Sequence, residues 1–484
     1  MSVPVPDGTR LPLTAAQLGI WFAQARDPHS PVYNTGEYVE LTGPLDADRF
    51  ERALRDVIAR TDALRLRFHP EADGTVTQSA DADPSFTVHR IDVSASPDPA
   101  AAADAWMRDV IARPLDAAGG GPLFTQALFK LGEGSHRWFS HVHHLLIDGY
   151  GFRLVAERVA RAYTGAAAGP DCSARELTDA EAAWRDSPAH DRDRAHWLAA
   201  PRRTPVTLAG STAPAAPHAR RHTAFVGRDV LAGLTAVAAA AETGWQVVAP
   251  AAVAAYVQWL TGEPGITLGM PVTARLTPAA RRTPGMVANV LPLYVAPRPA
   301  APLTELVADV RDALVPVLRH QRYPYEEARR DLGLVGERGY GPVVNVMPYQ
   351  RALDFGEAAA SVHPVSTGPV DDLKFSVYEE PGDTGLRIDV EANPDLYGEA
   401  ETAAHLERFT RFLRALAAAD PDTPLARLHA GETPADGDPQ EAAATGTLHA
   451  RFAARAAATP DAVAVSHEGD HLTYAELDAR ANRL

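Results

Sequence analysis

The amino-acid sequence predicts a mixed α/β protein built from two halves. Apolar residues recur with strand-like and helix-like spacing in the first third of the chain, and again from about residue 222 onward. Between these regions, residues 165–221 are rich in alanine, proline and charged residues, with one helical stretch near 180–199. Such a segment is typical of a bridge between two lobes. Hydrophobic residues make up 46% of the 484 residues, enough for a sizeable core.

The first half opens with a strand followed by a helix. Residues 38–41 are strand-like, and Asp46 is placed to accept hydrogen bonds from the first turn of a helix. That helix would bury one face, formed by Phe50, Leu54, Val57 and Ile58.

A hairpin and a second helix follow in this half. The strand-like runs 123–131 and 136–146 flank Gly132-Glu133-Gly134, which predicts a hairpin. The Asp148-Gly149 turn is then a junction between a strand and a helix, because the apolar residues after it recur at helical spacing: Phe152, Val155, Val159 and Tyr163.

The second half repeats the alternation of helices and strands and ends in an exposed tether. Its pattern predicts, in order, an alanine-rich helical stretch at 230–261, strands at 266–272 and 287–295, a helix at 303–321, strands at 343–347 and 386–391, and a helix containing Leu406, Phe409, Leu413 and Leu416. Residues 431–446 contain no large apolar residue and are rich in Gly, Pro, Asp, Glu and Ala, so we expect a domain boundary there.

Composition excludes several classes of protein. The chain has 62 acidic and 46 basic residues, a net charge of -16, and no stripe of Lys or Arg that could follow a phosphate backbone, which argues against nucleic-acid binding. A single cysteine, Cys172, excludes a disulfide framework and a multi-cysteine metal site. Because residues 1–10 are polar and no run approaches about 20 apolar residues, we expect a cytoplasmic protein without a leader or a membrane span.

The densest chemical signal is the HHxxxDG pattern at the end of the predicted hairpin. It consists of His143, His144, Asp148 and Gly149. Side chains alternate along a strand, so one of the two imidazoles can project into a cavity while the other packs against the protein. The aspartate, at a turn marked by glycine, can hold the backbone and orient the imidazole.

Two other interpretations of this pattern stand beside a catalytic one. A histidine near an aspartate at a strand end is commonly a satisfied structural pair. Zinc accepts these ligand types, but the opposed side-chain directions and the lack of a second ligand cluster argue against a metal site, so we expect none.

The pattern resembles the signature of condensation domains of nonribosomal peptide synthetases. Further segments resemble other motifs of that family, in the family's order: Leu13–Trp21, Arg60–Phe68, Gly285–Leu293, His320–Glu326, Gly341–Val346 and Gly368–Leu373. Residues 448–484, with Thr459–Val465 and Leu472–Leu477, resemble the beginning of an adenylation domain.

The resemblance implies a fold and domain boundaries. We expect two chloramphenicol-acetyltransferase-like α/β lobes that form a V-shaped pseudodimer, with a condensation N-lobe at 1–175, a C-lobe at 176–430, a linker at 431–446 and a truncated adenylation domain at 447–484.

It also implies an activity and partners. The family forms an amide bond between a donor thioester and the α-amine of an acceptor aminoacyl thioester. The upstream donor and the downstream acceptor are both held on phosphopantetheine arms of carrier proteins. The chain itself is then expected to bind no cofactor, and its adenylation domain would act in cis.

Site residues follow from the same resemblance. His144 is the expected catalytic group, acting either as a base or by orienting the amine, and Asp148 is expected to form a structural ion pair with Arg275. The oxyanion donor is either a backbone N–H near Gly149 or the imidazole itself. The complete expected set adds His143 and the channel candidates Gly151, Asn289, Tyr349 and Ser366.

The donor and the exact activity stay open. Many family members have serine where this chain has Gly151, and the runs 144–152, 289–293 and 368–370 are most similar to siderophore synthetases such as the enterobactin enzyme. An aryl or acyl donor therefore stands against an aminoacyl or peptidyl one. The order of domains disfavours an epimerisation domain, and the paired histidines disfavour a heterocyclisation domain. The remaining alternatives are a CoA-dependent acyltransferase and a non-catalytic platform that docks carrier proteins.

Overall fold

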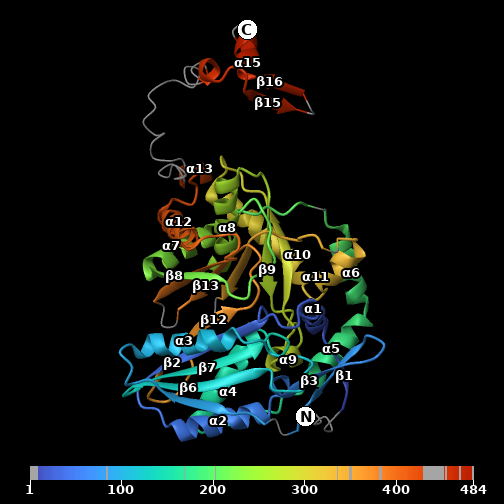
Figure 1. Ribbon diagram of the computed structural model, residues 1–484, viewed down its shortest axis with the longest axis vertical. Helices are drawn as coiled ribbons and strands as arrows, with labels where there is room; N and C mark the ends of the chain where they lie inside the picture. Colours follow the sequence, from blue (N-terminus) through green and yellow to red (C-terminus); the bar gives the residue numbers. More distant parts are fainter. Residues whose placement is uncertain are drawn as a thin grey trace. The chain divides into compact units, whose positions relative to one another are not determined.

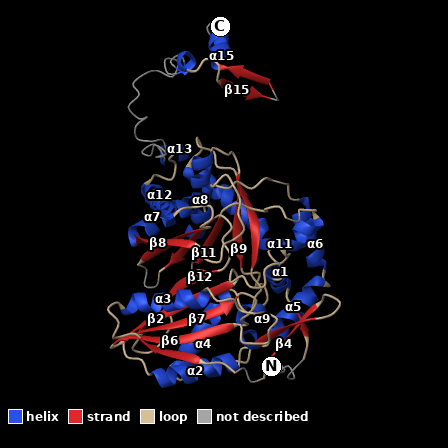
Figure 2. Cartoon of the chain, viewed as in Figure 1, coloured by secondary structure: helices blue, strands red, loops and turns tan. Residues whose placement is uncertain are grey.

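The computed structural model describes residues 9–428, except 83–84, 168, 202, 335, 348–351 and 381–383, together with residues 452, 455–467 and 470–481. The chain divides into two compact units, Met1–His429 and Ala430–Leu484. The first unit has the predicted mixed α/β organisation, with two large sheets, a smaller three-stranded sheet and their helices (Figures 1 and 2). The expected tether at 431–446 lies outside the described residues.

The first lobe is a five-stranded sheet with helices on both faces (Figure 1). Its strands lie in the order β12 (Ala359–Thr367), β2 (Asn34–Thr42), β7 (Ser135–His143), β6 (Phe124–Gly132) and β5 (Val88–Asp92). Apolar side chains of α3 (Pro99–Ile111) pack on one face, and those of α2 (Ala47–Ala59) and α4 (Gly149–Tyr163) pack on the other. A smaller part of the lobe contains β1 (Leu11–Pro12), β4 (Val76–Ala80), β3 (Leu66–Pro70), α1 (Ala15–Gln24) and the 3₁₀ turn Asp62–Arg65.

Local sequence signals account for several of these elements. Asp46 accepts hydrogen bonds from the N–H groups of Asp48 and Arg49 and so caps α2, as predicted. The hairpin of β6 and β7 is antiparallel and contains Gly134 at a φ of 65°, a conformation that favours glycine.

The bridge between the lobes contains two helices where the sequence indicated one. These are α5 (Ala174–Arg185) and α6 (Pro188–Ala199). The break has a simple cause, because Pro188 has no N–H to continue a helix but suits the first position of a new one.

The second lobe is a six-stranded sheet with one face covered by helices. The strand order is β10 (Asn289–Val295), β9 (Ile266–Val272), β11 (Val343–Met347), β13 (Leu373–Glu379), β14 (Gly385–Ala392) and β8 (Arg220–Gly227). Its large core includes α7 (Arg228–Ala240), α8 (Trp245–Thr261), α10 (Leu303–Arg319) and α12 (Glu399–Ala418). The shorter helices are α9 (Pro278–Arg282), α11 (Tyr325–Asp331) and α13 (Leu425–Leu428).

The alanine-rich stretch 230–261 also forms two helices rather than one. Helix α7 ends before Glu242, which has a φ of 55°, and Gly244 is the N-cap of α8. Most of α8 is fully buried, which explains why its apolar residues show no single face.

Strand β12 comes from the second half of the sequence but belongs to the sheet of the first lobe. It pairs antiparallel with β2, with Val362 opposite Val39 and Pro364 opposite Glu37. It is the edge strand of that sheet, where a proline is tolerated. The lobes are therefore joined by a shared sheet as well as by the bridge.

The second unit contains a two-stranded antiparallel sheet and a helix, β15 (Val463–His467), β16 (Asp470–Thr473) and α15 (Tyr474–Ala481). Among the described residues of both units, no helix is long and apolar enough to span a bilayer.

Candidate functional site

His144 lies immediately after β7, not within it. The strand ends at His143, but the backbone N–H of His144 still donates to the carbonyl of Tyr33 over 2.8 Å. Its ring Nδ1 lies 3.0 Å from the carbonyl oxygen of Ile147. Hydrogen bonds thus hold both the backbone and the imidazole ring of His144. The residue is half-buried.

The contact with Ile147 determines the tautomer of His144. A carbonyl oxygen only accepts hydrogen bonds, so Nδ1 must carry the proton, and Nε2 keeps its lone pair. Burial lowers the pKa of His144 below its ordinary value, although the Asp148 carboxylate acts in the opposite direction. The ring is therefore neutral near pH 7 and able to accept a proton at Nε2.

Gly368 lies next to the imidazole of His144, near its Cδ2 and Nε2 atoms. It follows β12 with a φ of 84°, and a Cβ atom added to it would lie 3.1 Å from Cδ2 of His144 and 3.8 Å from Nε2. The same Cβ would lie 3.6 Å from Cγ2 of Thr35 on β2. The missing side chain leaves space next to the acceptor nitrogen.

His143 is placed very differently from its neighbour. It is 1% exposed, its Nδ1 accepts from the N–H of Leu145, and its Nε2 donates to Oε1 of Gln24. Burial lowers the pKa of His143 to about 3. Both ring nitrogens are used inside the protein, so this residue, expected as part of the catalytic set, is placed to support the loop and not to meet substrate.

Asp148 is directed toward the second lobe. Both of its carboxylate oxygens accept from Nη2 of Arg275 over 2.9 Å, and the pair is almost fully buried. It also accepts from the N–H groups of Val287 and Ala288, and as the N-cap of α4 from that of Gly151. The aspartate thereby joins the histidine loop to the segment between β9 and β10.

The two glycines of the motif region have different surroundings. Gly149 is the first residue of α4 and is exposed, with no heavy atom within 4 Å of an added Cβ. Gly151 is buried, and an added Cβ would lie 3.1 Å from the backbone nitrogen of Gly285. Gly151 therefore permits close packing of α4 against that segment, rather than lining a channel as expected.

Two of the other channel candidates, Asn289 and Ser366, hydrogen-bond to nearby backbone carbonyls. Asn289 donates to the carbonyls of Gln321 and Tyr323, and Ser366 donates to the carbonyl of Asn34 over 2.9 Å. Tyr349 lies outside the described residues.

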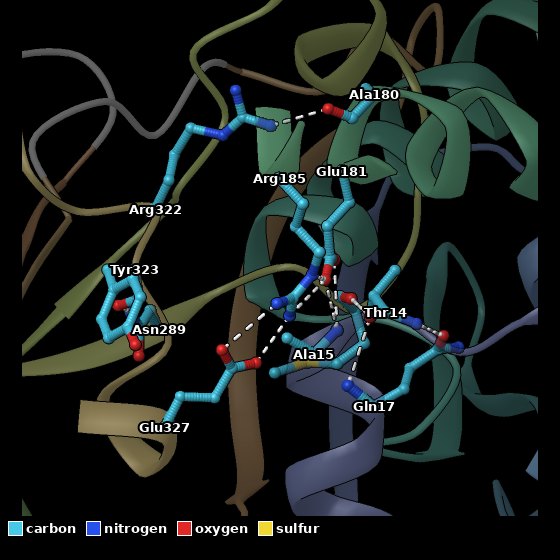
Figure 3. Close-up of polar contacts among 11 residues, drawn as sticks. Thr14, Ala15, Gln17, Ala180, Glu181, Arg185, Asn289, Arg322, Tyr323 and Glu327 are labelled. Carbon is cyan, nitrogen blue, oxygen red and sulfur yellow. Dashed lines mark hydrogen bonds and ion pairs between the residues drawn. The ribbon is translucent and has the colours of Figure 1, made fainter. Parts of the chain in front are cut away.

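A second set of polar contacts joins the lobes around the beginning of α1 (Figure 3). Glu181 of α5 accepts from the N–H of Ala15, and Arg185 of the same helix pairs with Glu327 of α11 at 2.6 Å. Thr14 caps α1 and donates to the carbonyl of Met286. Ala15 and Glu181 also line a cavity of about 70 Å³, together with Arg322 and Asn289.

An ionic network behind Gly368 was not predicted from the sequence. Glu391 of β14 is 1% exposed and pairs with Arg221 and Lys374, and its oxygens accept from Thr367 over 2.8 and 2.9 Å. Burial opposes its ionisation, but Arg221 and Lys374 outweigh burial and hold the pKa of Glu391 at about 2. The only signal in the sequence is that charged residues alternate with apolar ones along 386–392, which reads equally well as a solvent-facing strand.

Within the described part of the chain, no group of three His, Cys, Asp or Glu side chains is arranged to hold a metal ion. The site is thus a neutral, half-buried imidazole next to Gly368, held by a buried ion pair on one side and by β12 on the other.

Comparison with known proteins gives concordant matches. A family model described as "Condensation domain" matches residues 8–433. The chain is 40% identical over 487 residues to the isonitrile lipopeptide synthase of Streptomyces coeruleorubidus, covering 98% of this chain and 33% of that protein. It is 31% identical over 490 residues to enterobactin synthase component F of Escherichia coli O157:H7, covering 96% of this chain and 37% of that protein. The chain thus spans about a third of the length of these relatives.

A solved structure matches as well. The starter condensation domain of rhizomide synthetase, in complex with C8-CoA, is 39% identical with a TM-score of 0.80, and the match covers 86% of this chain and 97% of that domain.

Proposed function

This chain belongs to the condensation-domain family of nonribosomal peptide synthetases. From that premise we propose that it joins an acyl donor and an aminoacyl acceptor by an amide bond, with Nε2 of His144 accepting the proton of the attacking amine. The acyl donor and the aminoacyl acceptor are thioesters on phosphopantetheine arms of an upstream and a downstream carrier protein. The observation that carries the proposal is the hydrogen bond from Nδ1 of His144 to Ile147, which leaves Nε2 as a free acceptor.

The chemistry asked of the protein is modest. The acceptor nitrogen forms a bond to the donor carbonyl carbon, and the carbon–sulfur bond of the donor breaks. The proton lost by nitrogen passes through Nε2 of His144 to the departing thiolate. A free α-amine has a pKa of roughly 7.7 to 8.0, so a useful neutral fraction exists near pH 7, and alignment of the two reactants supplies much of the rate.

Asp148 and Arg275 act as positioning residues in this proposal. Their ion pair and the two backbone N–H groups bound to Asp148 hold the loop after β7 against the second lobe. The carboxylate does not reach the reacting atoms but stabilises the turn from which His144 projects.

The donor and the rest of the assembly are also proposals. Similarity to siderophore and starter enzymes supports an aryl or acyl donor over an aminoacyl one. The sequence of 447–484 supports an adenylation domain that follows in cis, as the beginning of the next catalytic unit.

The test uses both carrier proteins, loaded with donor and acceptor, and follows amide product by mass spectrometry. His144→Ala is expected to reduce the rate by about 10²- to 10⁴-fold, the range for loss of a general base. His29→Ala, at an exposed histidine, is the control and should leave the rate unchanged. A well-folded His144→Ala protein with the wild-type rate would contradict the proposal.

The same assay separates the alternatives. Equal turnover of an acyl-CoA and the corresponding carrier-bound thioester would favour a CoA-dependent acyltransferase. Capture of loaded carriers without amide formation would favour a docking platform.

A further inference from the structure

A row of charged side chains on the second-lobe sheet contacts the end of β12. Lys374 of β13 is directly opposite Glu391 of β14, and Glu391 is directly opposite Arg221 of β8. Residues that face each other across neighbouring strands project to the same side of a sheet. The neighbours of Lys374 in β13, Leu373 and Phe375, belong to the helix-covered core, so the row projects to the opposite face.

This row is bound to β12 at two points. Arg221 donates from Nη1 to the carbonyl of Pro364. Lys374 donates from Nζ to the hydroxyl of Thr367 over 2.8 Å, and that hydroxyl lies 2.8 and 2.9 Å from the two carboxylate oxygens of Glu391. The Thr367 hydroxyl therefore accepts from the ammonium and donates to the carboxylate at the same time.

Thr367 links this row to the reacting centre. It is the last residue of β12 and is followed by Gly368, at which an added Cβ would lie 3.1 Å from Cδ2 of His144. His144 belongs to the first lobe, whereas Lys374 and Glu391 belong to the second-lobe sheet. The approach of Gly368 to the imidazole is thus set by side chains of the other lobe, which act on the residue next to it.

Lysine is a rare residue in this chain. Of the 46 Lys and Arg residues, only Lys130 and Lys374 are lysines. Lys130 is exposed, whereas Lys374 is 9% exposed, and long charged side chains are seldom buried without partners. An ammonium is a compact charge whose donors point in several directions, whereas a planar guanidinium is suited to bidentate pairs. The residue type at 374 thus matches its two contacts, with Thr367 and, at 3.5 Å, with Glu391.

The row also brings a positive charge to this end of the site. The pKa of Glu391 is about 2, so its carboxylate is ionised throughout the working range, and the cations Arg221 and Lys374 exceed it by one charge. A positive charge disfavours protonation of a nearby imidazole. Burial is the main cause that lowers the pKa of His144; Asp148 opposes it, and Lys374 adds to it. The ammonium thus helps to keep Nε2 unprotonated.

We propose that Lys374 is a positioning residue for amide formation, which holds Gly368 against His144 and places a positive charge at that end of the site. It acts through the hydroxyl of Thr367, with Glu391 as the second support. The inference rests on the proposed function in taking His144 as the group that accepts the proton of the amine. It adds to that function a residue of the second lobe that acts on the reaction without belonging to the histidine motif.

Kinetics with loaded carriers test the link through Thr367. Thr367→Val keeps the shape of the side chain but removes the hydroxyl, and it should lower kcat about tenfold, with KM changed less than about twofold. Thr367→Ser keeps the hydroxyl and should retain most of the wild-type kcat, whereas Lys374→Met should lower kcat as Thr367→Val does. Thermal unfolding checks that each variant is folded at the assay temperature. If Lys374→Met does not fold, the contrast between the two Thr367 variants still decides, and equal kcat values in these two would overturn the proposal.

Titration of His144 tests the charge and needs no carrier proteins. The protein is labelled with ¹³C-histidine, the resonance of His144 is identified by its absence in His144→Gln, and its pKa is measured by NMR from about pH 4.5 to 8. Lys374→Met should raise this pKa above the wild-type value, because a nearby cation is removed. Thr367→Val keeps the ammonium and should raise it less. His143, whose pKa is about 3, stays neutral over this range.

Lys130→Met is the matched control, because it removes the other lysine of the chain. Lys130 lies opposite His136, at the end of the hairpin farther from His144, so the variant should leave both kcat and the pKa of His144 unchanged. A wild-type kcat in both Thr367→Val and Lys374→Met, or no rise of the pKa of His144 in Lys374→Met, would overturn the proposal. Absence of amide formation by the wild-type chain would instead contradict the proposed function, and the titration would still decide the role of Lys374.

Discussion

Gly368 stands against the imidazole of His144, so that a methyl group on its Cα would come within 3.1 Å of Cδ2. The substitution Gly368→Ala should therefore restrict the space beside Nε2 and reduce kcat/KM for amide formation by at least about tenfold, equivalent to roughly 1.4 kcal/mol of activation free energy. The measurement is a steady-state assay with loaded carriers.

Backbone strain must be separated from obstruction in this experiment, because Gly368 has a positive φ. Gly356 provides the control, since its φ is 73° and an added Cβ would meet no heavy atom within 4 Å. Gly356→Ala should show a similar loss of thermal stability with unchanged kcat/KM. Equal loss of activity in both variants would assign the effect to strain.

The pH dependence of the rate should reflect the acceptor amine more than His144 over most of the working range. Burial lowers the pKa of His144 below about 6.5, so the ring is still neutral at that pH and becomes protonated only as pH falls further. The logarithm of kcat/KM should rise with a slope of one between about pH 6.5 and 7.5, because the amine loses its proton near pH 8. A slope of two in this interval would show that the imidazole titrates there and would contradict the assignment.

The buried pair of Asp148 and Arg275 should show strong coupling. Arg275→Ala leaves a buried carboxylate without its cation and should reduce the free energy of unfolding by about 3–5 kcal/mol. Asp148→Asn should also destabilise the chain, and the double variant should lose less than the sum of the two. Urea unfolding of the four proteins provides the cycle, and additive losses would argue against direct coupling.

His141 should make the fold sensitive to acid. It is 1% exposed with neither ring nitrogen hydrogen-bonded, and burial lowers its pKa to about 4. Below about pH 6.5 the unfolded chain takes up a proton that the folded chain resists, so stability falls with pH until about pH 4. From pH 7.5 to 5.0 this residue alone should remove about 2 kcal/mol.

His141→Phe should remove that share of the pH dependence, as measured by urea unfolding at the two pH values. His29→Phe, at an exposed position, should leave the dependence as it is in the wild type. An unchanged dependence in His141→Phe would mean that other groups account for the acid sensitivity.

The elements with strong local signals could be predicted well. Strands β9 and β11 occupy the residues predicted for them, and Asp46 caps the N-terminus of α2 as predicted. The breaks at Pro188 and at Gly244 were missed because apolar residues continue on both sides of each, so periodicity alone shows no interruption. Strand β12 gives almost no local signal, since its residues are only partly buried and it contains Pro364. Its pairing with β2 is set by contacts over 300 residues apart in the chain.

The candidate site shows the same division. The sequence pattern indicated that the two histidines have opposite environments, and the structure gives each its own: a buried hydrogen-bonded ring for His143 and a half-buried ring for His144. Position on a strand was the wrong reason, because β7 ends before His144. Glu391 could not be singled out, since a lone charged residue in a strand is most often solvated and only the meeting of the two lobes buries this one.

Chimeras that combine the N-terminal half of one enzyme with the C-terminal half of a related one are constrained by β12, because this strand is encoded in the second half but completes the sheet of the first lobe. A junction at the bridge would combine β2 of one parent with an edge strand of the other, and each mismatch in that ladder would alter the backbone that carries Gly368. A fragment that ends at the bridge would lack β12, so the backbone N–H and C=O groups along one edge of β2 would be unpaired. Such an exposed edge strand can pair with another copy of the chain and promote self-association. Chimeras should therefore carry residues 359–368 together with the N-terminal sheet that receives them.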